Sequence, residues 1–69
     1  MKLEEVRKMK PSELLANLFI KRDNIRTIKG NLENNYIEGS RIKAELDSLL
    51  EIEEHDYNLV INEIYRRLH

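Results

Sequence analysis

The sequence contains no cysteine and no tryptophan, and only one proline and two glycines interrupt its 69 residues. Without cysteine, the chain cannot form a disulfide, a thiolate nucleophile or a cysteine-based metal site. No apolar run approaches the ~18 residues that a transmembrane helix needs, and no signal-peptide pattern opens the chain. We therefore expect a cytoplasmic protein without a membrane segment.

What the chain does contain is typical of one small folded domain. Hydrophobic residues make up 41% of it, and 12 Lys and Arg nearly balance 13 Asp and Glu, so it does not have the composition of a disordered segment. We expect a single domain over residues 1–69. A domain of this length buries only ~60% of its unfolded surface. Since disulfides are excluded, a partner is a plausible source of added stability.

The first half of the chain has helical periodicity. Pro11 is suited to the first turn of a helix, and residues 2–9 have the pattern of a short separate helix. We expect a long helix that begins near Pro11 and carries an apolar stripe of Leu14, Leu18, Ile25, Ile28 and Leu32. Residues 34–40 contain two Asn, Gly39 and the capping residue Ser40, and they predict the break after this helix.

The second half repeats the pattern, with steps of three and four residues that average ~3.7 per turn, close to a straight helix. Glu53 interrupts its apolar stripe within the polar run 51–56. We favour one continuous helix through this run over a break at which Asp56 caps a final helix. The stripe consists of Ile42, Leu46, Leu49, Glu53, Tyr57, Val60, Ile64 and Leu68.

No segment alternates with the two-residue period of a strand, so the predicted fold class is all-α. We expect an antiparallel hairpin of two long helices with a short N-terminal helix, self-associating into a helical bundle. Charge supports this pairing, because residues 1–30 carry a net charge of +4 and residues 31–69 a net charge of −5. The side chains expected to steer helix pairing or partner choice are Lys21, Arg22, Arg26, Glu51 and Glu54.

The two helices carry more apolar residues than a hairpin can cover. The surplus must be covered by residues 2–9, by a second copy or by another protein. We therefore predict a small protein-interaction module or regulator, an adaptor or inhibitor that binds a protein partner or forms a homo-oligomer, with a dimer favoured. The residues predicted to make these contacts are Leu15, Phe19, Ile20, Leu59, Ile61 and Tyr65.

Residues for catalysis or metal binding are few. The three serines and two histidines form no catalytic signature, and Ser12 and Ser40 suit helix caps. Glu51 and His55 share a helix face, but two ligands fall short of the three or four that a metal site takes. We predict no catalytic residue, no cofactor and no metal, and therefore no enzyme.

One segment suggests an alternative. Residues 42–50 resemble the signature of the short sporulation-regulating aspartyl-phosphate phosphatases, which are two-helix hairpins with a Ser-Gln-Glu-Leu-Asp motif on the second helix. Glu45, Leu46 and Asp47 match that motif, whereas Lys43 and Ala44 replace its Ser and Gln. The resemblance implies that Asp47 takes the place of the key acid and that the partner is a phosphorylated response regulator.

A second alternative is nucleic-acid binding through the basic segment 21–29, which could contact phosphates from one helix face. The net acidic chain and the lack of a helix-turn-helix spacing make this role less favoured. The richness in Asn, Ile and Lys is compatible with an AT-rich bacterial or phage genome, including a mobile element, in which small helical regulators are common.

Overall fold

The computed structural model describes the backbone of residues 1–34 and 41–69, and these residues form three helices without a strand. Helix α1 spans Leu3–Lys8, α2 spans Pro11–Asn34 and α3 spans Arg41–Leu68. The all-α prediction with a short first helix is therefore confirmed. The predicted break, with Gly39 and the Ser40 cap, lies outside the described residues except for Asn34.

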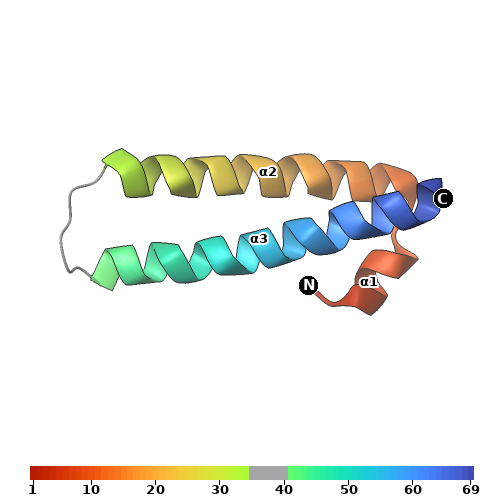
Figure 1. The fold of residues 1–69 in the computed structure, drawn as a ribbon, viewed down its shortest axis with the longest axis horizontal. Helices are drawn as coiled ribbons and strands as arrows, with labels where there is room; N and C mark the ends of the chain where they lie inside the picture. The colour runs from red at the N-terminus through yellow and green to blue at the C-terminus, as the bar shows by residue number, and fades with distance from the viewer. Residues whose placement is uncertain (35–40) are drawn as a thin grey trace.

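The two long helices pack antiparallel along almost their whole length, and α1 lies against α3 at the end of the hairpin that holds both termini (Figure 1). The molecule is accordingly elongated, with dimensions of 44 × 18 × 17 Å. Because α1 has only six residues, it spans ~9 Å and reaches only one end of the hairpin.

The helix boundaries follow the sequence signals in most places. Pro11 is the first residue of α2, where its missing N–H costs no hydrogen bond. The helix continues through Gly30, so that glycine does not end it. Helix α3 runs unbroken through residues 51–56, as expected. Asp56 is buried within this helix and does not cap a new one.

The hydrophobic core lies where the three helices meet. Its fully buried members are one side chain from each helix, Val6, Leu14 and Val60. Toward the loop end only α2 and α3 are present, and two helices cannot enclose a side chain completely. Two members of the predicted stripe, Ile42 and Leu49, are therefore half exposed.

The register of the hairpin is marked by a polar cluster inside it. Lys21 occupies the gap in the apolar stripe of α2, between Leu18 and Ile25, and Glu53 interrupts the stripe of α3. These two side chains meet, with Lys21 Nζ 3.1 Å from Glu53 Oε2 and 3.3 Å from Asp56 Oδ2. The Asn24 amide also donates to Glu53 Oε2, at 3.4 Å. Glu53, which interrupts the apolar stripe of α3, therefore pairs with polar side chains on the facing helix.

Burial alone would lower the pKa of Lys21, but hydrogen bonds and charge from Glu53 and Asp56 outweigh that effect and raise the pKa above its usual value. The amino group of Met1 adds a third contact, 3.4 Å from Asp56 Oδ1. No buried side-chain nitrogen or oxygen of the described residues lacks a hydrogen-bond partner, which permits buried charge between two mainly apolar helix faces.

Candidate protein-interaction surface

An apolar groove runs between the first half of α2 and the last half of α3. Two adjoining depressions that share Ile64 form it, and nearly all of their lining is apolar. We call this surface the open groove. Its lining residues are Pro11, Leu14, Leu15, Leu18, Tyr57, Ile61, Ile64, Tyr65, Arg67 and Leu68.

The open groove lies on the side of the hairpin that α1 does not cover. The Asn17 side-chain amide donates a hydrogen bond to the sulfur of Met9, which follows α1, so Asn17 faces α1. Glu63 faces the same side, because it binds Arg67, whose guanidinium donates to a carbonyl oxygen of α1. Leu15 is two residues from Asn17, and Ile61 is two residues from Glu63. Two residues correspond to ~160° around a helix. Leu15 and Ile61 therefore point to the side away from α1, whereas Leu14, Ile64 and Arg67 lie between the groove and α1.

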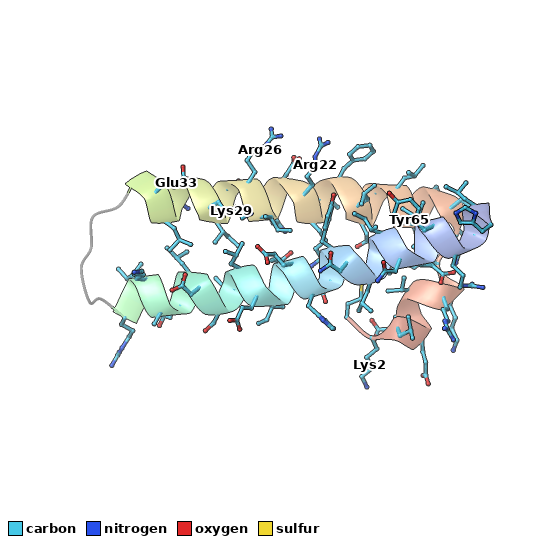
Figure 2. All side chains as sticks on the ribbon, in the orientation of Figure 1. Lys2, Arg22, Arg26, Lys29, Glu33 and Tyr65 are labelled. Carbon is cyan, nitrogen blue, oxygen red and sulfur yellow. The ribbon has the colours of Figure 1, made fainter. Side chains whose placement is uncertain are left out.

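The edge of α2 continues this surface toward the loop end with basic side chains. Phe19 is half exposed, and the Arg22 guanidinium lies over its ring, 5.3 Å from the centroid. Figure 2 shows Arg22 and Arg26 pointing away from α3, whereas Lys29 points toward it. The accessible surface is thus apolar near the termini and positively charged along the middle of α2.

The six residues predicted to contact a partner fall into three groups. Leu15, Phe19 and Tyr65 are 50–60% exposed and lie in or beside the open groove, and Ile61 lines it half buried. Leu59 packs against the core cluster. Ile20 is also exposed, but it lies ~140° around α2 from Leu15 and so on a different face.

The charged residues predicted to steer helix pairing or partner choice differ in whether they pair within the chain. Lys21 is committed to the polar cluster within the hairpin, and Glu54 pairs with Lys29 at 3.8 Å between two well-exposed side chains. Within residues 1–34 and 41–69, no carboxylate forms an ion pair with Arg22 or Arg26. Glu51 is exposed. Arg22 and Arg26 therefore keep their charge available at the surface.

Sequence reasoning missed a charged cluster that fastens α1 to α3. Glu63 is 2% exposed and accepts hydrogen bonds from Arg66 at 2.6 Å and Arg67 at 2.7 Å. These bonds lower the pKa of Glu63 to about 2. Arg67 also donates to the Arg7 carbonyl oxygen at 3.0 Å, at the C-terminal end of α1. The spacing of Glu63 to Arg66 and Arg67 was the available signal.

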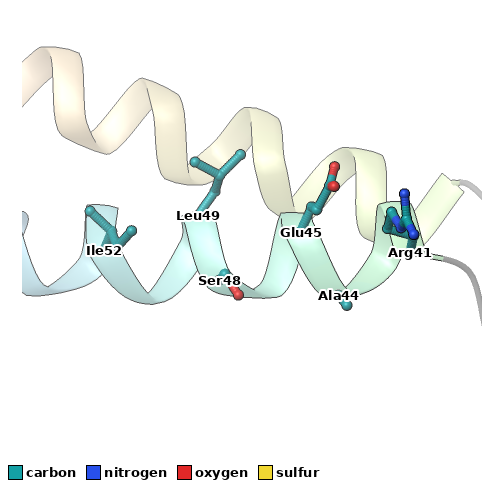
Figure 3. Close-up of a pocket in the computed structure, with 6 residues that line it drawn as sticks. All are labelled: Arg41, Ala44, Glu45, Ser48, Leu49 and Ile52. Atoms are coloured by element: carbon teal, nitrogen blue, oxygen red, sulfur yellow. The ribbon is translucent and has the colours of Figure 1, made fainter.

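A second depression lies along α3 near the loop end and was also missed. Its apolar part comes from Ala44, Leu49 and Ile52, and the last two are about half exposed (Figure 3). Of the three residues that match the phosphatase motif, Glu45 lines the depression, whereas Asp47 is exposed elsewhere on α3. The lining residues are Arg41, Ala44, Glu45, Ser48, Leu49 and Ile52.

Two features are absent from the part of the chain that the structure describes. No group of three His, Asp or Glu side chains gathers there in a geometry that could hold a metal ion. None of the three helices has the length and hydrophobicity of a membrane span. The most distinctive accessible feature of these residues is thus the open groove with its basic edge.

No family model, curated protein or solved structure matches the chain. The likeness to the aspartyl-phosphate phosphatases therefore rests on Glu45, Leu46 and Asp47 alone.

Proposed function

We propose that this protein is a protein-interaction module that binds another polypeptide surface through the open groove. The observation that supports this proposal is the concentration of half-exposed apolar side chains on the side of the hairpin that α1 leaves uncovered. Such contiguous apolar surface is characteristic of interaction sites, because a small monomer otherwise has no means of keeping it from water.

The energetics favour an extended contact over a single anchoring side chain. Covering a half-exposed Leu, Phe or Tyr gains roughly 1 kcal/mol, about half the value for complete burial. Association costs at least ~4 kcal/mol in lost translational and rotational freedom. Leu15, Phe19, Ile61, Tyr65 and Leu68 must therefore be covered together, and their placement along one groove allows a single partner surface to do so.

The test compares three alanine variants with the unmodified protein. Phe19→Ala and Tyr65→Ala remove side chains at the open groove, and Ile20→Ala removes an equally exposed side chain from another face of α2. We expect the first two to weaken association about fivefold for each side chain lost from the interface, which is the equivalent of ~1 kcal/mol, while far-UV circular dichroism stays unchanged. Ile20→Ala should have little effect. Association is measured by light scattering of the protein alone and by quantitative capture of partners from its own cells.

Other results would contradict the proposal. If all three variants associate as tightly as the unmodified protein, the open groove is not the binding surface. Salt-sensitive binding of DNA or RNA that depends on Arg22 and Arg26 would instead indicate a nucleic-acid-binding protein. Hydrolysis of an aspartyl-phosphate that is lost in Asp47→Asn, with the fold retained, would indicate the phosphatase alternative.

A further inference from the structure

We infer that the occupant of the open groove is a second copy of this chain, related by a two-fold axis that runs along the hairpin and places α2 of each copy against α3 of the other. This inference rests on the proposed function and adds the partner and its orientation. It is based on the charges that border the groove, on the register of the hairpin and on the dimensions of the molecule.

The charges beside the groove are of opposite sign on the two helices. Arg22 and Arg26 lie on the outer side of α2, and no described carboxylate of their own chain pairs with them. Asp47 and Glu54 are seven residues apart, so they share one side of α3. Glu54 has only the long, exposed contact with Lys29. Each copy therefore offers a basic strip and an acidic strip side by side.

The register places these strips at matching heights. Lys21 and Asn24 both reach Glu53, so residues 21–24 of α2 lie level with this part of α3. Rotation about an axis along the hairpin leaves heights unchanged. It would bring Arg22 level with the second copy's Glu54, and Arg26, ~6 Å further along α2, level with the stretch of α3 between that copy's Glu54 and Asp47. Nearer the termini, the same rotation brings one apolar groove onto the other.

The other simple two-fold arrangement fits poorly. An axis across the hairpin would place α2 against α2 and α3 against α3, so that Arg22 and Arg26 would face a second basic strip. It would also pack the apolar end of one copy against the charged end of the other. Like charges at an interface oppose association, and unlike charges set the orientation in which two surfaces meet. The charges therefore select the axis along the hairpin.

The size of the molecule is adequate for such a dimer. The whole molecule measures 44 × 18 × 17 Å, so one long side covers roughly 800 Å², which is about what each partner contributes to a stable interface of ordinary size. In the resulting four-helix arrangement every helix would be antiparallel to both of its neighbours, as in up-down bundles.

The experiment uses two charge-reversed proteins, the double variants Arg22→Glu, Arg26→Glu and Asp47→Lys, Glu54→Lys. Their self-association is measured by sedimentation equilibrium beside that of the unmodified protein. We expect a dimer for the unmodified chain and at least tenfold weaker dimers for each variant alone. An equimolar mixture should recover the original affinity as a heterodimer, which native mass spectrometry distinguishes by mass. The control is Arg41→Glu, a reversal outside both strips.

Several outcomes would overturn the inference and leave the proposed function standing. Homodimers of the two variants that are as tight as the original would mean that the opposite-sign strips do not face each other. An unmodified protein that is monomeric at millimolar concentration, but whose groove variants lose a different protein partner, would identify another occupant. Failure of Phe19→Ala and Tyr65→Ala to alter any association would instead overturn the proposed function itself.

Discussion

Replacement of Lys21 by methionine is the sharpest test of how the hairpin is held in register. The Lys21 side chain is 17% exposed and contacts two carboxylates, one of which, Asp56, is buried. Methionine keeps most of the apolar length of lysine and helix propensity but removes the charge. The Lys21→Met substitution would therefore leave Glu53 and Asp56 with weaker compensation, while packing along the stripe of α2 is retained.

The expected cost follows from the contacts that remain. Breaking one side of a buried ion pair costs ~3–5 kcal/mol. Here Asp56 keeps the amino group of Met1, and Glu53, whose side chain is 17% exposed, keeps the amide of Asn24. These contacts reduce the expected loss to ~2–3 kcal/mol. A domain of this size has ~3–5 kcal/mol of stability in total, so the substitution should remove most of it.

Urea unfolding followed by circular dichroism at one fixed protein concentration measures this effect. With a slope of ~1 kcal/mol per molar urea for so small a protein, the midpoint should fall by ~2–3 M. The matched control is Lys29→Met, which removes the exposed contact with Glu54 and should cost less than ~0.5 kcal/mol. The double variant Lys21→Met, Glu53→Met should recover at least ~1 kcal/mol, because it removes one uncompensated charge. Equal midpoints for Lys21→Met and Lys29→Met would refute the reasoning.

Three further predictions concern single residues. Gly30→Ala should raise the free energy of unfolding by ~1 kcal/mol, because a Cβ there meets nothing within 4 Å and alanine is the better helix former; a lower thermal midpoint would contradict this. Leu14→Ala should lower the free energy of unfolding, measured in urea, by ~2–3 kcal/mol, since Leu14 is 2% exposed in the core. A loss below ~1 kcal/mol would mean that the core is loosely packed. The lowered pKa of Glu63, about 2 against 4.5 unfolded, means that its ionised form stabilises the fold above pH ~4.5 and that this contribution is lost as pH falls toward 2. Glu63→Gln should therefore destabilise the protein at pH 7, and its urea midpoint should converge with that of the unmodified protein near pH 2; a constant difference across this range would argue against the assignment.

Much of the candidate interaction surface could be anticipated from the sequence, because surplus apolar residues on a helix need a cover. Leu15, Phe19, Ile61 and Tyr65 were selected on that basis, and all four lie in or beside the open groove. Ile20 and Leu59 met the same criterion but lie elsewhere, Ile20 on another face of α2 and Leu59 against the core. Periodicity gives the angle of a side chain around its own helix, but not which angles the neighbouring helices cover.

By itself, the sequence determined the helices and their pairing. The spacing of apolar residues, Pro11 at a helix start and the opposite charges of the two halves are local or additive properties that need no knowledge of the packed structure. Tertiary structure alone decided which side of the hairpin α1 covers and which carboxylates become buried. Glu63 and Asp56 resemble solvated helix residues in the sequence. The packing of α1 against Arg67 accompanies the burial of Glu63, and Lys21 from the facing helix compensates the buried Asp56. The contacts of Asp56 with Lys21 and of Arg67 with the Arg7 carbonyl oxygen join residues far apart along the chain, and their geometry exists only once the helices have packed.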